Sequence, residues 1–358
     1  MQKKFLSSIK EIIRDAKRGK MFILVDDKNR ENEGDLVISA SKCNSKNINF
    51  MAKNGRGLIC LALTKKQVDR LSLPLMSSVN KARMQTAFTV SIEAKKGIST
   101  GISAFDRAKT IKVAINEKTK KKDIVSPGHV FPLVARNGGV LERAGHTEAS
   151  IDISRLAKLN PSAVICEVMN EDGRMARFDD LVKFSKKHKL KIATIEDLIS
   201  YRLKNEKLII NTDNKVVHFN NFGKFEMKIF TNKLDGVEHF VIKKGIFKPS
   251  KSIPVRVLST NFFNNIINPN IVSLKKSLNY LKRFNNFALV LINNQNISSL
   301  KLIDKKHQSN NTLRYYGIGA QIIKDLKIKN MVLISRSRKK IIGLEGYGIK
   351  ITKQEIIK

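Results

Sequence analysis

The stretch Met21-Phe22-Ile23-Leu24-Val25 is followed by Asp26-Asp27 and then by Arg30-Glu31-Asn32-Glu33-Gly34-Asp35. A short continuous run of Val, Ile, Leu and Phe is typical of a strand buried on both faces. The loop after it sets three carboxylates and a guanidinium at the strand's end, where a metal and an anion are better accommodated than in a core. Because charge clusters usually face water, the alternative is a solvated turn with ordinary surface charges.

Two glycine-rich segments further along the chain hold two of its six histidines. They read PGHVFPL at 127–133 and GGVLERAGHTE at 138–148, and each histidine follows a glycine that lets the backbone approach a ligand closely. In RAGHT at 143–147, a guanidinium, backbone amides and a hydroxyl can jointly hold a phosphate while the imidazole turns to a metal. A lone histidine would more often be an ordinary core or surface residue, so the surrounding residues carry the inference.

A third segment, VICEVMNEDG at 164–173, again indicates an apolar strand. Glu167 is flanked by apolar residues, so we expect it to be partly buried, which suits a carboxylate to proton transfer. The alternative is an outward-pointing residue on an edge strand.

Together these segments resemble the 3,4-dihydroxy-2-butanone 4-phosphate synthases, enzymes of riboflavin biosynthesis. The resemblance includes GRGLIC at 55–60, TAFTV at 86–90 and STGISAFDR at 99–107, and it runs in order from about residue 5 to about residue 202. It implies conversion of D-ribulose 5-phosphate to L-3,4-dihydroxy-2-butanone 4-phosphate and formate, with magnesium, in a homodimer.

Removing one carbon of a ketopentose phosphate as formate requires proton transfers beside a carbonyl oxygen, and therefore acid/base groups and a divalent metal. The positions that match the family's metal ligands are Glu31 and His146. Magnesium keeps several waters and needs few protein ligands, although a histidine leaves manganese as a plausible substitute; no zinc is expected. His129 and Glu167 match the positions essential for catalysis. The positions that match substrate-holding residues are Arg30, Glu31, Asp35, Arg143, Ala144, Gly145, His146, Thr147 and Glu167.

The chemistry of these side chains suggests how the work is divided. Arg143 and Thr147 are suited to the phosphate, and Asp35 to hydroxyls or to proton transfer. The segment 99–101 offers further amides and hydroxyls, and Asp106 either orients a base or caps a turn. Cys60 is not expected to act as a nucleophile, because an apolar neighbourhood raises a thiol pKa.

A domain boundary is predicted near residue 205, giving domains 1–205 and 206–358. Thr194 and Asp197 predict the capped start of the last helix before that boundary. Beyond it, 313–326 and 343–348 resemble GTP cyclohydrolase II, which implies a shared fold.

Cyclohydrolase II chemistry needs a zinc ion held by three cysteine thiolates, and the chain has no cysteine after Cys166. The motif begins at 256–260, yet 261–273 carries Asn, Ile and Pro where thiolates belong, and Thr312 replaces an expected aspartate. Arg314 survives at the position of the family's proposed nucleophile. The second domain is therefore predicted to be inactive, with roles in packing, dimerisation or regulation.

Composition bounds the remaining alternatives. The 358 residues are enough for two domains, and a hydrophobic content of 42% argues against disorder. The sequence contains no run of about 18 apolar residues, so no membrane span is predicted. The three cysteines lack paired or metal-binding spacing, which fits a reducing cytoplasm. The net charge of +37 would attract RNA, yet the basic residues are spread, tryptophan is absent and no nucleic-acid motif appears, so no specific nucleic-acid partner is predicted.

The sequence thus predicts an α+β fold, with a mixed β-sheet layered with helices, followed by a smaller α/β cyclohydrolase II-like domain. The predicted function is a magnesium-dependent lyase. The alternatives are a bifunctional enzyme that retains cyclohydrolase II activity, and a basic RNA-associating protein with a vestigial enzyme site.

Overall fold

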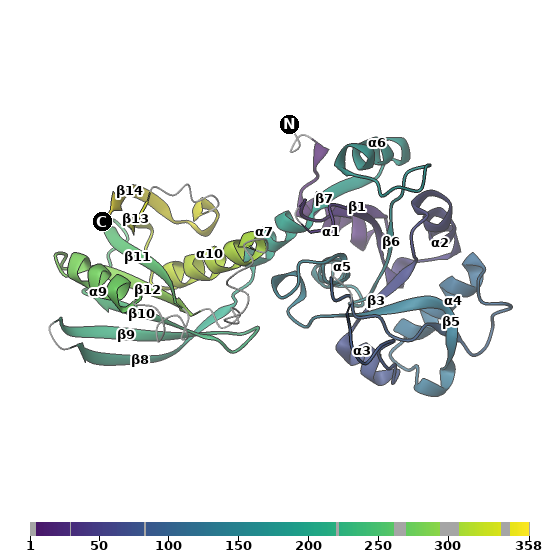
Figure 1. Ribbon diagram of the computed structural model, residues 1–358, viewed down its shortest axis with the longest axis horizontal. Helices are drawn as coiled ribbons and strands as arrows, with labels where there is room; N and C mark the ends of the chain where they lie inside the picture. Colours follow the sequence, from purple (N-terminus) through teal and green to yellow (C-terminus); the bar gives the residue numbers. More distant parts are fainter. Residues whose placement is uncertain are drawn as a thin grey trace. The chain divides into compact units, whose positions relative to one another are not determined.

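The computed structural model describes residues 5–28, 30–81, 84–219, 222–260, 270–293, 308–337 and 344–357. Its contacts divide the chain into two compact units, Met1–Tyr201 and Arg202–Lys358 (Figure 1). The predicted boundary at residue 205 coincides with the last residue of helix α7 (Ile195–Asn205). Within the described ranges, no helix is both long and apolar enough to cross a membrane.

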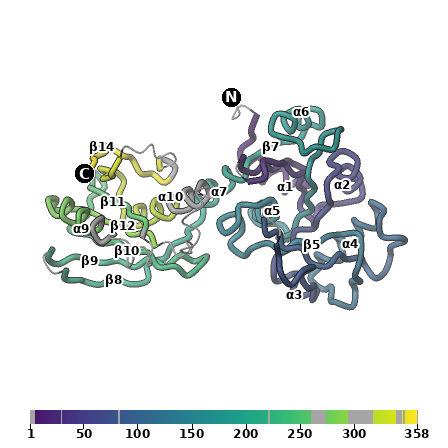
Figure 2. The backbone as a smooth tube through the Cα atoms, viewed as in Figure 1, coloured from purple at the N-terminus to yellow at the C-terminus, as the bar shows by residue number. Residues whose placement is uncertain are grey.

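The first unit alternates strands and helices irregularly along the chain (Figure 2). Its elements before α7 are α1 (Ile9–Lys17), β1 (Phe22–Val25), β2 (Gly34–Ser39), α2 (Ser45–Phe50), β3 (Cys60–Thr64), α3 (Lys65–Arg70), β4 (Ile92–Ala94), α4 (Ala104–Ile115), β5 (Ile124–Ala135), α5 (His146–Leu156), β6 (Ala163–Glu167), α6 (Phe178–His188) and β7 (Lys191–Thr194). The strand predicted from 21–25 is β1, and all four of its residues are buried.

The seven strands form one mixed sheet in the order β4-β5-β3-β6-β2-β1-β7. The pairs β1–β7 and β3–β5 are parallel, and the pairs β1–β2, β2–β6, β3–β6 and β4–β5 are antiparallel. Since β6 lies between β3 and β2, the alternative of an edge strand for Glu167 is wrong. The predicted α+β fold with a mixed sheet is confirmed.

The two faces of this sheet are covered by different helices. Leu36 and Ile38 of β2 point to a core cluster that also contains Ile48 of α2, Ile111 of α4 and Leu181 of α6. Successive residues of a strand point to opposite faces, so the residues between these face the other way. Helix α5 packs on that second face, where the hydroxyls of Ser39 and Ser154 lie 2.8 Å apart. We call this side the α5 face.

Local signals account for the helix ends. Ser8 caps α1 by accepting a hydrogen bond from the amide of Glu11, whose carboxylate accepts in return from the Ser8 amide. The predicted cap of α7 is confirmed, since Thr194 Oγ1 accepts from the Asp197 amide at 3.0 Å and donates to its carboxylate at 2.8 Å.

The second unit is a sheet in the order β14-β13-β11-β12-β10-β9-β8, with parallel pairing from β14 to β12 and antiparallel pairing from β12 to β8. Its elements are β8 (Ile209–Phe219), β9 (Gly223–Asn232), β10 (Glu238–Lys244), β11 (Ser252–Thr260), α9 (Asn270–Leu281), β12 (Phe287–Asn293), α10 (Gln308–Asp325), β13 (Asn330–Ser335) and β14 (Lys350–Ile356).

The central strand β12 of this second sheet is buried on both faces. Ala288 and Val290 of β12 join a core with Ile322 of α10, whereas Phe287 and Leu289 join another core that includes residues of α9. Alternate residues of one strand therefore pack on helices on opposite sides, as in an α/β layered domain.

Candidate active site

The loop after β1 is organised by the carboxylate of Asp26. It accepts hydrogen bonds from the Arg30 guanidinium at 2.9 Å, the Glu31 amide at 3.1 Å and the Glu33 amide at 2.9 Å. Asn32 has a φ of 56°, a left-handed conformation that asparagine tolerates better than most residues. The loop is thus a compact turn built around a buried acid rather than a solvated turn of free surface charges.

Glu31 and Asp35 meet His146 at the start of α5. The Nδ1 atom of His146 lies 3.8 Å from Glu31 Oε2 and 3.8 Å from Asp35 Oδ1, distances of ion pairs rather than hydrogen bonds. The structure thus brings together the two predicted metal ligands, which are far apart in the chain. Asp35 and His146 are buried and Glu31 is half-buried.

Charge and burial compete to set the pKa values of this group. Burial favours neutral His146, yet the carboxylates of Asp35 and Glu31 outweigh it and raise the pKa of His146 to about 9. Burial likewise opposes ionisation of Glu31, but the attraction of His146 and Arg30 lowers its pKa to about 2. Burial dominates at Asp35 and raises its pKa to about 7, against the attraction of His146 and with the repulsion of Glu167.

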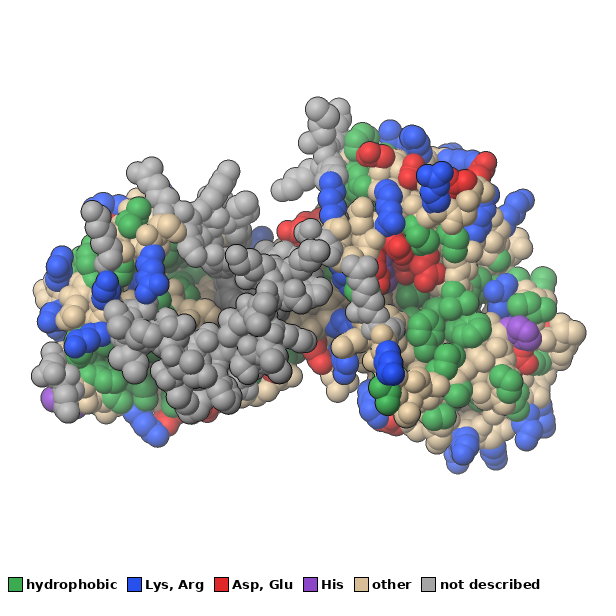
Figure 3. All heavy atoms as spheres, in the orientation of Figure 1, with side chains coloured by type: hydrophobic (Ala, Val, Ile, Leu, Met, Phe, Trp, Pro, Cys, Tyr) green, Lys and Arg blue, Asp and Glu red, His purple; other side chains and the backbone are tan. Residues whose placement is uncertain are grey.

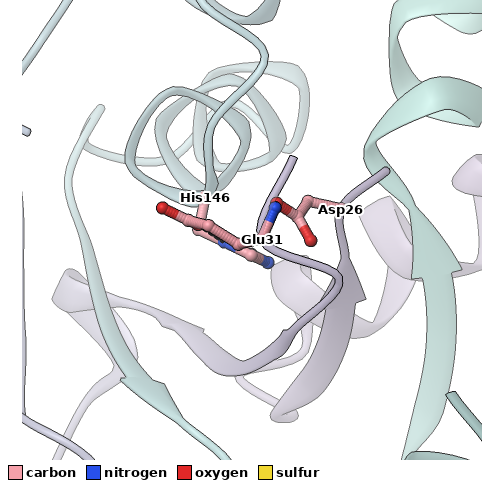
Figure 4. A group of neighbouring side chains, drawn as sticks. All are labelled: Asp26, Glu31 and His146. Atoms are coloured by element: carbon pink, nitrogen blue, oxygen red, sulfur yellow. Dashed lines mark hydrogen bonds and ion pairs between the residues drawn. The ribbon is translucent and has the colours of Figure 1, made fainter. Parts of the chain in front are cut away.

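One atom of this group has no hydrogen-bond partner in the described part of the chain. The Nε2 atom of His146 is buried, and among the described residues no group hydrogen-bonds to it. A buried polar atom without a partner is rare and suggests a ligand or ion. Ligand atoms of Asp26, Glu31 and His146 all lie within 4.8 Å of one another, and their side chains converge in Figure 4. Because Asp26 already accepts three hydrogen bonds, Glu31 and His146 have the greater capacity left for a metal.

Glu167 stands beside this group on the α5 face. It is the cross-strand neighbour of Asp35 in the β2–β6 ladder, and its Oε2 accepts a hydrogen bond from the Leu58 amide at 2.8 Å. A Cβ atom at Gly57 would lie 2.6 Å from that same Oε2 atom and 2.6 Å from the Glu167 carbonyl oxygen. Only glycine therefore lets the backbone approach this carboxylate so closely.

His129 lies on β5, which is separated from β6 and Glu167 by β3. The β3–β5 and β3–β6 ladders both pass through Cys60. In these ladders Cys60 pairs with Phe131 of β5 and with Ile165 of β6, which lie two residues from His129 and Glu167 respectively. Within the chain His129 hydrogen-bonds through Nδ1 to Glu93 of β4 rather than to the carboxylates of Glu167 or Asp35.

The RAGHT stretch forms the entry to α5. Gly145 is the N-cap, and the amide of Ala149 donates to its carbonyl at 2.9 Å. The amides at the start of a helix precede that first bond and make a ready site for an anion, beside the buried Thr147. Arg143 is fixed here, because it donates to Glu148 at 2.6 Å and to Thr86 Oγ1 at 3.1 Å.

Two further sequence expectations concern residues near this site. Asp106 accepts from the amide and hydroxyl of Ser99 and from the amide of Gly101, so of its two predicted roles the contacts favour that of a cap. Burial raises the thiol pKa of Cys60 far above its usual range, which agrees with the prediction that this thiol is not a nucleophile.

The sequence analysis did not single out Arg177. This residue contacts the loop after β1 that carries Glu31 and Glu33, which we call the acidic loop. From the N-cap of α6 its guanidinium donates to the carbonyls of Glu31 at 2.7 Å and Asn32 at 2.6 Å, and it lies 3.7 Å from the Glu33 carboxylate. No short motif signals a contact between residues so far apart in the chain.

A mixed sheet that presents adjacent carboxylates beside an imidazole–carboxylate pair and a helix N-terminus defines an enzyme of metal-assisted acid/base chemistry on a phosphorylated substrate. The family model "3,4-dihydroxy-2-butanone 4-phosphate synthase" matches residues 10–201. The chain belongs to this family. A second model, GTP cyclohydrolase II, matches residues 212–355.

Several known proteins are similar along the whole chain. The riboflavin biosynthesis protein RibBA of Aquifex aeolicus is 44% identical, covering 98% of this chain and 92% of that protein. A 3,4-dihydroxy-2-butanone 4-phosphate synthase of Neisseria meningitidis (strain MC58) is 41% identical, covering 97% of each.

Solved structures of the same family are also similar to this chain. RibBX of A. baumannii, described as a two-domain 3,4-dihydroxy-2-butanone 4-phosphate synthase, matches with a TM-score of 0.83 and 38% identity, covering 98% of this chain and 99% of that one. A 3,4-dihydroxy-2-butanone 4-phosphate synthase in complex with two magnesium ions matches with a TM-score of 0.53 and 38% identity, covering 56% of this chain and 98% of that one.

Proposed function

We propose that the chain converts D-ribulose 5-phosphate to L-3,4-dihydroxy-2-butanone 4-phosphate and formate in riboflavin biosynthesis. The observation that carries the proposal is the pair of half-buried Glu31 and buried His146, set beside Asp35 and Glu167. The Nε2 atom of His146 has no hydrogen-bond partner among the described residues. We further propose that the protein is a cytoplasmic homodimer. The family membership and the relatives' names support the reaction.

Each residue's part follows from its surroundings. Glu31 and His146 would hold magnesium, or manganese in its place, and the bound ion would polarise substrate oxygens. The carboxylate and imidazole fit such an ion, and the partnerless Nε2 atom offers it a site. Proton transfer then falls to the protein's own groups.

 Asp35, whose pKa near 7 lets it exchange a proton close to neutrality, is the group best suited to moving protons between substrate hydroxyls and carbon.

The remaining roles are substrate binding, at the N-terminus of α5, and further acid/base catalysis, on the sheet. Arg30, Arg143, Ala144, Gly145 and Thr147 would hold the substrate, with its phosphate at the N-terminus of α5. Glu167 and His129 would complete the acid/base set, because Glu167 is the cross-strand neighbour of Asp35 and His129 lies on β5 of the same sheet.

Formate release from D-ribulose 5-phosphate, measured with and without magnesium, tests this proposal. Glu31→Gln and His146→Ala should each lower activity by at least ~100-fold and weaken magnesium binding, since each removes a ligand. Glu117→Gln, an exposed carboxylate of the same unit, is the matched control and should change neither. Near-normal turnover of either ligand variant at low magnesium would contradict the assignment.

The acid/base assignment has its own experiment. His129→Ala and Glu167→Gln should each lower kcat by ~10²–10⁴-fold while substrate still binds, because the phosphate contacts remain. Calorimetry that showed lost binding, with normal chemistry at saturating substrate, would reverse these roles.

For the second unit we propose a fold without cyclohydrolase II activity and without zinc. The support is the absence of any cysteine after Cys166, which leaves three thiolate ligands unsupplied. Residues 261–269 and the side chains of Thr312 and Arg314 lie outside the described residues. The similarity to the two-domain RibBX synthase supports a lyase with an altered second domain, whereas the similarity to RibBA proteins is the basis of the bifunctional alternative.

We also propose no specific nucleic-acid partner. On the face shown in Figure 3, Lys and Arg side chains are scattered over both units rather than gathered into one patch, while acidic side chains gather on the first unit beside apolar ones.

A further inference from the structure

Glu93, which is not among the predicted site residues, lies beside the proposed acid/base residue His129. Its Oε1 atom is within hydrogen-bonding distance of His129 Nδ1, and 15% of the Glu93 side chain is exposed against 44% of the His129 side chain. An ionised carboxylate only accepts hydrogen bonds, so this contact requires the imidazole to carry its proton on Nδ1.

The backbone around the pair is built to hold it. In the β4–β5 ladder, Ile92 pairs with Val130 but Glu93 pairs with Val125, so residues 126–129 bulge out of the ladder at this step. Bulges re-aim side chains and occur often beside active sites. The bulge aims the His129 ring at the carboxylate of Glu93.

Contacts on both strands fix the bulge. The Ser126 hydroxyl donates to the Ser91 carbonyl at 2.7 Å, and the Gly128 amide donates to the Ser91 hydroxyl at 3.1 Å. A Cβ atom at Gly128 would lie 2.2 Å from the carbonyl carbon of Ile92, so a side chain there would push the two strands apart. The position of the imidazole is therefore set by the backbone rather than by a free side chain.

The carboxylate is backed from its other side. Gly101 has a φ of +88°, and a Cβ atom at that position would lie 1.7 Å from Glu93 Oε1. The loop that carries Gly101 is itself fastened, because the Gly101 amide donates to Asp106 at 3.1 Å. Glu93 is thus held between a glycine and the imidazole.

We propose that Glu93 is a positioning residue, which fixes His129 in the Nδ1–H tautomer and leaves Nε2 as the ring nitrogen that exchanges a proton with the substrate. The inference rests on the proposed function, because it needs His129 to act in proton transfer. An orienting carboxylate of this kind holds the ring in one tautomer and stabilises the imidazolium formed during turnover.

Three variants test the proposal. Glu93→Gln keeps the shape but loses the charge, and its amide can donate to Nδ1 and favour the other tautomer; kcat should fall about 10- to 100-fold with little change in KM. Glu93→Asp keeps the charge and should recover part of that loss, which a merely structural role would not predict. Glu117→Gln, an exposed carboxylate-to-amide control, should behave as the wild type.

A spectroscopic measurement separates this inference from the proposed function. Nitrogen-15 spectra of the imidazoles, with His129 assigned by loss of its signals in His129→Ala, should show the Nδ1–H tautomer in the wild type and its loss in Glu93→Gln. An Nε2–H tautomer in the wild type, or wild-type kcat in Glu93→Gln when His129→Ala is inactive, would overturn the inference. Normal activity of His129→Ala would instead remove the proposed role of His129, and the positioning role with it.

Discussion

Magnesium binding at Glu31 and His146 should displace a proton from the imidazole. The neighbouring carboxylates raise the pKa of His146 to about 9 in the metal-free protein, so at pH 7 the imidazole is almost wholly protonated and cannot be a ligand. Each pKa unit corresponds to about 1.4 kcal/mol, so removing the proton at pH 7 costs about 3 kcal/mol and weakens metal binding about 100-fold relative to pH above 9.

The sign follows from the direction of the shift. Below the folded pKa of His146 the proton competes with the metal, so affinity should rise about tenfold per pH unit from 7 to 9 and then level off. Glu31, with a pKa of about 2, is ionised throughout this range and should not contribute. Asp35, with a pKa of about 7, contributes mainly below pH 8.

Calorimetric titration with magnesium at pH 8, repeated in buffers of different ionisation enthalpy, measures the number of protons released. About one proton per His146 site is expected there, since His146 is still mostly protonated and Asp35 is already mostly ionised. His146→Asn should abolish the release, whereas His188→Asn, at the end of α6, should not change it. Proton-free binding at pH 8, with an affinity that is constant from pH 7 to 9, would refute the reasoning.

Three further outcomes are expected. Arg177→Gln frees the carbonyls of the acidic loop and should weaken magnesium binding about 10-fold in calorimetry, whereas the exposed control Arg174→Gln should not; equal effects would remove the special role of Arg177. Gly57→Ala would set a methyl group 2.6 Å from Glu167 Oε2 and should lower kcat by at least ~10-fold in the formate assay, and unchanged turnover would show that this carboxylate needs no fixed position. The full-length protein should release no formate from GTP even with added zinc, so any such turnover would contradict the argument from missing cysteines.

Hydrophobic pattern was enough to predict the strands that flank the site. The apolar run at 21–25 corresponds to β1, and the segment at 164–173 begins with β6, because short stretches rich in Val and Ile favour a buried strand. Pattern does not define strand order, however. The adjacency of Asp35 and Glu167 depends on β2 pairing with β6, which joins parts of the chain more than 100 residues apart.

The sequence likewise predicted some residues of the candidate site and missed others. Glu31 and His146 stand in recognisable motifs, and the structure brings them together. Arg177 and Glu93 contact site residues that are distant in the sequence, and such contacts leave no local signature. Asp26 looked like the end of a strand, and only its three hydrogen bonds show that it organises the loop.

The hydrogen bonds from Arg177 to the acidic loop affect when the proposed metal site can form during protein synthesis. The loop carrying Glu31 leaves the ribosome early, but the guanidinium that holds its carbonyls follows 146 residues later. His146 also emerges long after Glu31. Because domains fold as units during translation, a nascent chain that ends before α6 carries Glu31, the first of the two proposed metal ligands, without the support of Arg177. If Glu31 and His146 are the ligands, we expect magnesium affinity to arise only when nearly all of the first unit has been made.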